Sequence, residues 1–173
     1  MGIKKAKYEN ILIVDSDTEF YKTDFKKLLN SFSAIPSNKI GVVQPQLIHT
    51  DGEVQKSALE FPTVKNKIQR FFGKINTPYD LNQTQKVDYC ISAAWLVKKR
   101  TFNEVGLLDE NIFYAPEDAE FCKRLWVREL EVWYYNDVQI IHHYQRITSK
   151  KKFTKMWFLH LKDLIYFWIK YMK

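Results

Sequence analysis

The chain of 173 residues is 46% hydrophobic and 16% aromatic with five glycines and five prolines, which fits one globular domain and excludes a disordered or low-complexity protein. Its net charge of +7 lies in the tail: eight Lys or Arg and one acid occur from Arg146 onward, whereas residues 1–145 hold 19 basic and 19 acidic side chains. The body is therefore neutral, and the tail predicts that one terminal element contacts an anionic surface.

The first predicted element is a strand at residues 9–14, because Ile11 to Val14 are consecutive aliphatic residues. Such a run is typical of a strand buried on both faces inside a parallel α/β sheet. Asp15 and Asp17 follow directly, at the strand end where ligands of these sheets bind. Two carboxylates this close favour a bound cation such as Mg²⁺ or Mn²⁺. The alternative is a polar turn that caps the next helix.

A helix is predicted at residues 21–32 from the spacing of its apolar side chains. The segments after it are predicted in this order: a strand at 40–48 with Pro45 at a bulge or an edge, a hairpin turn at Asp51-Gly52, an extended return at 53–61, a short helix at 64–72 and a polar loop at 76–85. Alternating strands and helices of this kind predict an α/β domain.

The second half of the chain is predicted to contain further strands and helices, some with polar residues at their ends. Its elements are a strand at 87–97, a helix at 100–105 ended by Gly106, a helix from Glu117 to about residue 129, and short strands at 132–135 and 138–141. The small residues Ser92 to Ala94 would allow the close approach of either a ligand or a packed helix. Glu117-Asp118 at a helix start and His142-His143 at a strand end are each weak signals when taken singly.

Together, the order and spacing of these features resemble the family-2 glycosyltransferases. The resemblance covers nearly all of residues 2–149 and lies in the segments GIKKAKYENILIVDSDT, GVVQPQLIHTDGEVQKSALEFPT, VDYCISAAWLVKKRTFNEVGLLDENIFYAPEDAEFCKRL and VWYYNDVQIIHHYQRIT. The most similar subgroup is that of the rhamnosyltransferase-like enzymes of bacterial surface-polysaccharide synthesis. The resemblance implies an α/β fold of the GT-A type, with a mixed, mainly parallel sheet flanked by helices.

The resemblance implies a divalent-metal cofactor, Mg²⁺ or Mn²⁺. Asp15 and Asp17 match the Asp-x-Asp motif, which binds the metal and through it the diphosphate of a nucleotide-sugar donor. His142 matches the histidine that lies near the metal and the diphosphate, and His143 is the alternative.

The resemblance also implies catalytic roles for the acid pair. Asp118 matches the general base, and Glu117 would orient it or contact the acceptor. Ser92 falls where the family often has a glycine on the acceptor side. One displacement assisted by a single base inverts the anomeric carbon. The implied activity is therefore that of an inverting hexosyltransferase acting on the hydroxyl of a glycan or lipid-linked acceptor.

The resemblance divides the chain into a partial catalytic domain at 1–149 and a basic, aromatic, amphipathic helix at 150–173. The family's first strands, which bind the base and ribose of the donor, have no counterpart here, so the match is to the C-terminal two-thirds of the catalytic domain. A partner chain that supplies the missing half is one expectation. The alternative function is an inactive remnant that serves as a membrane- or glycan-binding module or as a subunit of a split enzyme.

The tail at 150–173 combines seven aromatic residues with its basic ones. One interpretation is an interfacial helix on anionic lipid, and the other is a helix that packs on the domain. Nucleic acid is not an expected partner, because the body is neutral and aromatics on an apolar helix face are poor stacking platforms. Cys90 and Cys122 match no metal or redox spacing, which favours buried free thiols in the reducing cytoplasm. If the tail is interfacial, the protein is expected to be peripheral on the inner face of the cell membrane.

Overall fold

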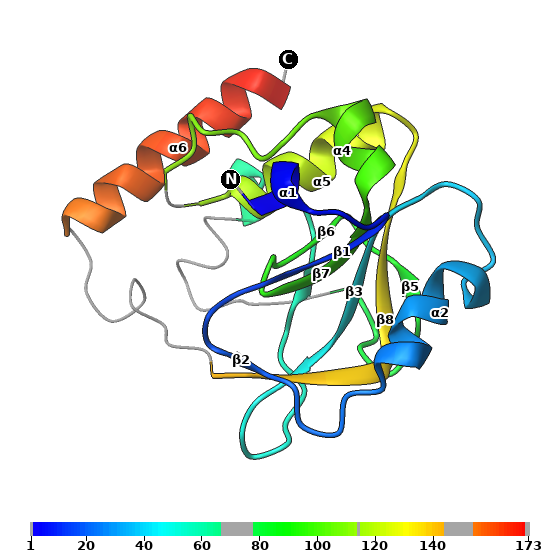
Figure 1. Ribbon diagram of the computed structural model, residues 1–173. Helices are drawn as coiled ribbons and strands as arrows, with labels where there is room; N and C mark the ends of the chain where they lie inside the picture. The colour runs from blue at the N-terminus through cyan, green and yellow to red at the C-terminus, as the bar shows by residue number, and fades with distance from the viewer. Residues whose placement is uncertain (1, 67–77, 114, 144–153, 172–173) are drawn as a thin grey trace.

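The computed structural model describes residues 2–66, 78–113, 115–143 and 154–171. Its centre is a sheet in the order β1, β7, β3, β8 and β2, with β5 also paired to β8 (Figure 1). The strand bounds are β1 Asn10–Val14, β2 Thr18–Glu19, β3 Ile40–Ile48, β5 Gln85–Lys86, β7 Ala94–Lys98 and β8 Glu131–His142. A second, small sheet pairs β4 (Ala58–Leu59) with β6 (Tyr89–Cys90). The predicted α/β fold with a mixed sheet is confirmed.

Parallel pairing in this sheet is confined to its centre. Strands β3 and β8 are parallel over most of their length, whereas β1–β7, β3–β7, β2–β8 and β5–β8 are antiparallel. The sheet is therefore less parallel than the sequence analysis expected. Parallel neighbours need a long crossover. The chain between β3 and β8 provides it, together with the helices α4 (Lys99–Val105) and α5 (Glu117–Val127).

Strand β1 lies at an edge of the described sheet, and its predicted burial on both faces is wrong. Ile11 is buried, but Leu12 and Ile13 are only half-buried and Val14 is 41% exposed. On one side β1 pairs with β7 along its whole length; on the other it pairs with no described strand. A run of aliphatic residues reports strand propensity but cannot distinguish an edge strand from a central one.

Two strand predictions are corrected by irregular pairing. Residues 132–135 and 138–141 belong to the single strand β8, whose register against β3 jumps between Pro45 and Gln46. Proline donates no ladder hydrogen bond, so Pro45 occupies this bulge as predicted. Conversely, the predicted strand at 87–97 is divided into β6 and β7 by a turn at Ser92 and Ala93. The small residues there form a turn and are not part of a continuous strand.

Helices cover both faces of the sheet. On one face α2 (Phe25–Ala34) packs Leu28 against Val43 and Leu96. It starts later than predicted because the Asp24 side chain caps it by accepting a hydrogen bond from the Lys27 amide at 2.8 Å. On the other face α5 packs Phe121 and Leu125 against Val42 of β3 and Trp95 of β7. These two residues directly precede Val43 and Leu96 in their strands. A Cβ added at Gly41 would lie 2.8 Å from Leu125, so the small residue permits this close approach.

The remaining helices lie at the periphery. They are α1 (Gly2–Lys5), a helical turn at 64–66 and α6 (Lys155–Tyr171). The predicted continuation of the turn at 64–66 to residue 72 falls outside the described residues. Helix α4 ends at Gly106, whose φ of 85° favours glycine, as predicted. Helix α6 packs on the domain through Asp163, Leu164 and Phe167, and residues 150–153 and 172–173 of the predicted 150–173 helix lie outside the described residues. Within the described ranges, no helix is long and apolar enough to span a membrane. Cys90 and Cys122 are free and buried, as predicted.

Candidate active site

Asp15, Asp17 and His142 meet where β1 and β8 end. One potential ligand atom from each lies within 4.8 Å of the other two. The turn after β1 is fixed at both ends, because the Asp15 amide donates to Ala93 O at 3.0 Å and the His143 amide donates to Asp17 O at 2.8 Å. Pairing of Thr18 with His142 in β2 and β8 completes this connection. The structure therefore brings together three of the residues singled out from the sequence.

His142 is oriented by Gln55, a residue that the sequence analysis did not identify. His142 Nδ1 lies 2.8 Å from Gln55 Oε1, and both side chains are buried. An amide oxygen only accepts hydrogen bonds, so Nδ1 carries a proton, and the neutral form of the ring then has its lone pair on Nε2. That lone pair faces the aspartates, with Nε2 3.4 Å from Asp17 Oδ1. Metal-binding histidines are commonly held in this way by a hydrogen bond at the other ring nitrogen.

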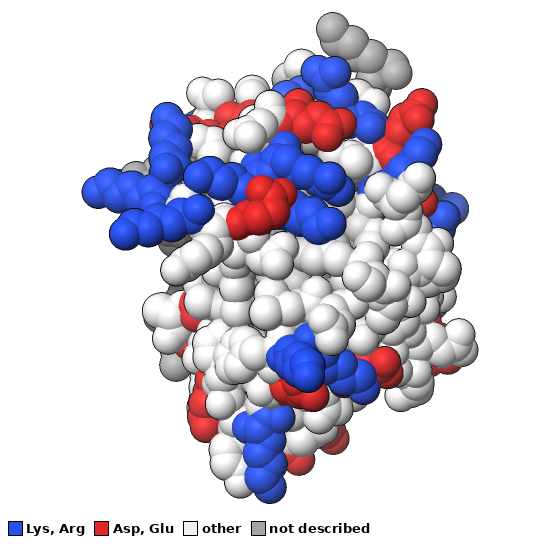
Figure 2. Space-filling model, turned by 45° about the vertical axis from the view of Figure 1, so that its right-hand side comes forward, with Lys and Arg blue, Asp and Glu red and all other residues white. Residues whose placement is uncertain are grey.

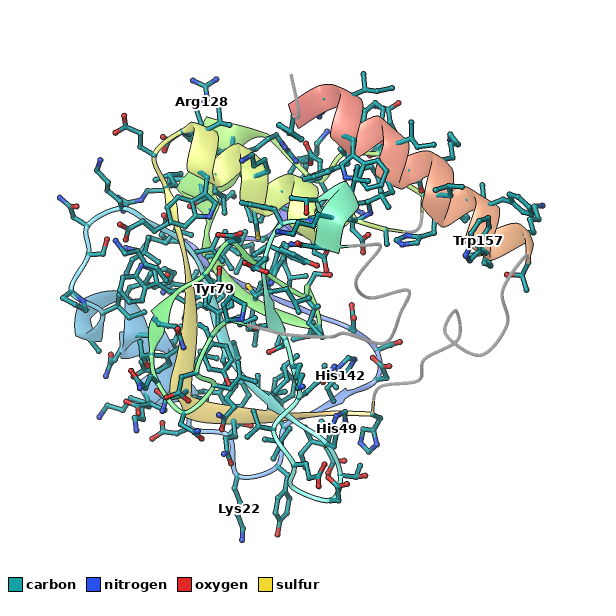
Figure 3. The ribbon with its side chains drawn as sticks, turned by 180° about the vertical axis from the view of Figure 1, so that it is seen from behind. Lys22, His49, Tyr79, Arg128, His142 and Trp157 are labelled. Atoms are coloured by element: carbon teal, nitrogen blue, oxygen red, sulfur yellow. The ribbon has the colours of Figure 1, made fainter. Side chains whose placement is uncertain are left out.

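His143 has a different environment. It is exposed, and its Nε2 lies 2.9 Å from Glu19 Oε2. Successive residues of a strand point to opposite faces, so only one of the two histidines can face the aspartates. The geometry places His142 there, and Figure 3 shows it near the end of β8.

The electrostatics of this cluster favour a cation. Burial raises the pKa of Asp15, the charge of Asp17 raises it further, and His142 opposes the rise. Two carboxylates and a neutral imidazole form a hard, largely oxygen-based donor set, which suits Mg²⁺ or Mn²⁺. The residues therefore fit the divalent metal that the resemblance implies, and a bound cation would remove the repulsion between the aspartates.

The acid pair lies at the start of α5. Asp118 is half-buried, and its Oδ1 accepts a hydrogen bond from the Ala119 amide at 2.7 Å. Glu117 Oε2 is buried and has no hydrogen-bond partner within the described parts of the chain. Burial raises the pKa of Glu117 to about 8, with further contributions from the charges of Asp118, Asp15 and Asp163. Glu117 thus holds its proton at neutral pH, and its interaction with Asp15 shows that the acid pair and the metal-ligand cluster are electrostatic neighbours.

Helix α6 holds the loop that leads into α5. Its buried Asp163 accepts a hydrogen bond from the Phe113 amide at 2.9 Å. His160 Nδ1 lies 3.2 Å from Ala115 O, and the Tyr166 hydroxyl donates to Asp109 at 2.9 Å. Asp163 is therefore a second residue near the site that sequence reasoning missed. In the sequence it is only an interruption of an apolar tail, and its relation to Glu117 depends on how α6 packs.

Glu120, one turn beyond Glu117, is fully buried and surrounded by donors. Its Oε2 accepts hydrogen bonds from Arg124, with Nε at 3.0 Å. Its Oε1 accepts from Lys170 at 2.8 Å and from the Tyr171 hydroxyl at 2.6 Å. Burial alone would lower the pKa of Lys170, but its bonds with Asp109 and Glu120 raise it overall. This set of contacts, the Glu120 network, joins α5 to α6.

Comparison with known proteins supports a relationship to glycosyltransferases. No family model matches the chain. The low-salt glycan biosynthesis hexosyltransferase Agl10 of Haloferax volcanii is 23% identical over 148 residues, which are 83% of this chain and 46% of that protein. The chain thus spans slightly under half the length of this curated relative.

Solved structures agree on the fold. The crystal structure of GalNAc-T7 with UDP, GalNAc and Mn²⁺ matches with a TM-score of 0.59 and 15% identity, over 84% of this chain and 29% of that one. The crystal structure of A197 from STIV matches with a TM-score of 0.50 and 16% identity, over 83% and 62% of the two chains. The fold is that of the GT-A glycosyltransferases.

Proposed function

We propose that this chain is the catalytic portion of a metal-dependent, inverting glycosyltransferase of family 2. It would transfer a sugar from a nucleotide-sugar donor to the hydroxyl of a glycan or lipid-linked acceptor in surface-polysaccharide synthesis, as rhamnosyltransferase-like enzymes do. The observation that carries the proposal is the meeting of Asp15, Asp17 and His142 within 4.8 Å, with the partly buried acid pair as an electrostatic neighbour. The hexosyltransferase relative and the GT-A fold support it.

In this proposal Asp15, Asp17 and His142 hold Mg²⁺ or Mn²⁺, and Gln55 positions His142. The bound cation would neutralise the negative charge that develops on the nucleoside diphosphate as it leaves. The turn fixed by the hydrogen bond from the Asp15 amide to Ala93 O keeps the ligands in place before the donor binds.

Asp118 is the proposed general base, which takes the proton of the acceptor hydroxyl as that oxygen attacks the anomeric carbon. Glu117 is proposed to act in its protonated form, because its pKa is raised to about 8 by burial and by neighbouring carboxylates. A neutral Glu117 donates a hydrogen bond to the acceptor and adds no second negative charge beside Asp118. A single displacement of this kind inverts the anomeric configuration.

A second candidate function is a subunit of a split enzyme, or an inactive binding module. The outer edge of β1 has no partner strand in the described sheet, and Val14 there is 41% exposed. An edge strand with unused backbone groups can accept a strand from another chain or segment.

The two functions are distinguished by nucleotide binding and turnover. We expect the chain to bind a nucleoside diphosphate in calorimetry with Mn²⁺ and not with EDTA. We expect Asp17→Asn to lose this binding and Asp118→Asn to retain it. Release of nucleoside diphosphate from a panel of sugar nucleotides then measures turnover, which Asp118→Asn should abolish. Binding without turnover by the unmodified chain supports the split-enzyme function, and no metal-dependent binding contradicts the proposed site.

A further inference from the structure

Helix α6 has an outward side that remains apolar. Its inward side buries Asp163, Leu164 and Phe167, but three large residues are exposed: Phe158 by 56%, Ile165 by 44% and Ile169 by 67%. Residues spaced by seven and four positions lie on one side of a helix, so these three form a continuous stripe. In Figure 1 the helix runs along the periphery of the molecule.

Two lysines flank this stripe. Lys155 and Lys162 lie within about one-sixth of a turn of it in the helical projection, and both are exposed, the Lys162 side chain by 68%. Lys162 lies 3.7 Å from Asp163 Oδ1, a longer contact than those of Lys170, whose ammonium group Asp109 and Glu120 hold at 2.8 Å each. Trp157 packs edge-on against Phe158, with ring centroids 5.1 Å apart, at the outer end of the helix shown in Figure 3. Tryptophan is enriched at membrane–water interfaces.

The charge of the chain points to the kind of surface that this side of α6 would meet. The sequence from Arg146 onward carries eight basic residues and one acid, whereas the rest is neutral. On the face in Figure 2, acidic residues are interspersed with the basic ones and a broad uncharged area separates the charged groups. An apolar stripe with flanking lysines on one helix complements the two layers of an anionic bilayer, its acyl boundary and its charged headgroups.

We propose that the outward face of α6, made of Phe158, Ile165 and Ile169 with Lys155 and Lys162, docks on the surface of an anionic lipid bilayer. The three apolar side chains enter the acyl boundary, and the lysines contact headgroup phosphates. The proposal does not depend on the proposed glycosyltransferase activity. If that activity holds, docking sets the loop before Glu117 near the membrane, because the inward side of the same helix binds Asp109 and Phe113.

The test is sedimentation of the full chain with vesicles of equal parts phosphatidylcholine and phosphatidylglycerol. We expect Phe158→Ser/Ile165→Ser/Ile169→Ser to weaken binding by at least about tenfold, because three partly exposed side chains lose their apolar contact. Phe25→Ser/Leu29→Ser is the matched control, since these residues of α2 are 46% and 47% exposed. Its binding should equal that of the unmodified chain, and circular dichroism should show the same folded spectrum for all three proteins.

A charge variant separates lipid docking from simple hydrophobic adhesion. We expect Lys155→Gln/Lys162→Gln to weaken binding to these vesicles by about fivefold for each lysine and to reduce its dependence on salt. Binding to pure phosphatidylcholine should be weaker from the start and unchanged by this variant.

Three outcomes would overturn the proposal. The unmodified chain could fail to bind the anionic vesicles, or the triple variant could bind them as well as the control does. In analytical ultracentrifugation without vesicles, the unmodified chain could also be a dimer and the triple variant a monomer. That result would assign the face to a second copy of the chain.

Discussion

Two regions of this molecule hold clustered carboxylates in opposite ways. In the Glu120 network, Arg124, Lys170 and Tyr171 supply donors to a fully buried acid from within the protein. In the candidate site, Asp15, Asp17 and Glu117 form no ion pair with a Lys or Arg of the described residues, and the pKa values of Asp15 and Glu117 are raised. The first arrangement stabilises the junction of α5 and α6. The second is costly by itself and leaves the acids free to act on a cation, a proton or a substrate.

The largest expected effect is on stability, in the Glu120 network. Glu120→Gln removes the negative charge between Arg124 and Lys170, which are 20% and 33% exposed at their side chains. Removing one partner of a buried ion pair destabilises a protein by about 3–5 kcal/mol. Urea unfolding at neutral pH measures this loss. Glu129→Gln is the matched control, because Glu129 pairs with Lys39 at the surface and its removal should change stability little.

If Glu120→Gln and Glu129→Gln have the same effect, the buried network contributes no more than a surface ion pair. The Glu120 network would then not stabilise the junction of α5 and α6 more than a surface ion pair does, and the contrast between the two regions would not hold.

A divalent cation should stabilise the candidate site, which lacks the internal cations of the Glu120 network. At a Mn²⁺ concentration about 100 times the Kd, the expected gain is about 2.7 kcal/mol. Thermal unfolding with Mn²⁺ and with EDTA measures it. Asp17→Asn should abolish the gain, whereas Asp137→Asn, at an exposed residue paired with Lys27, should retain it. A gain that survives Asp17→Asn would place the cation elsewhere.

Glu117 predicts a pH dependence whose sign follows from its raised pKa. Its pKa is about 8 in the folded chain against an ordinary 4.5, so between these values the folded state holds a proton that the unfolded state has released. Stability therefore falls as the pH rises through this window. Glu117→Gln removes this loss, and we expect the variant to gain about 1–3 kcal/mol over the unmodified chain at pH 8. At pH 4.5 the two should be equal.

Urea unfolding in EDTA at both pH values measures the Glu117 effect without a contribution from bound cations. Glu129→Gln should act in the opposite direction, because Lys39 lowers the pKa of Glu129 and the wild-type acid is stabilising once ionised. A Glu117→Gln variant that is less stable at pH 8 would mean that ionised Glu117 has a favourable partner.

Local rules in the sequence located much of the fold and of the site. The turn after β1, the glycine that ends α4 and the acid pair that begins α5 are set by neighbouring residues, and all lie where predicted. Whether a strand lies at the edge or at the centre of the sheet depends on strands that are distant in the sequence. For this reason the predicted burial of β1 was wrong. Asp163 and Gln55 were missed for the same reason. Asp163 lies near the site only because α6 packs against the loop that leads into α5. Gln55 lies there only because its segment packs against β8.

Gln55 provides the smallest expected effect and tests whether the metal-ligand cluster is positioned in advance. Gln55→Met keeps a similar volume but cannot accept the proton of His142 Nδ1, so His142 loses the hydrogen bond at 2.8 Å that fixes its tautomer. Loss of such a contact weakens metal affinity by about 10–100-fold, and we expect the lower end because both aspartates remain. Calorimetric titration with Mn²⁺ measures the change, with Gln139→Met as a control that breaks a different glutamine pair, at Gln46. Unchanged affinity in Gln55→Met would show that His142 either does not bind the cation or needs no support. Because the titration requires neither donor nor acceptor, it examines the site independently of the proposed reaction.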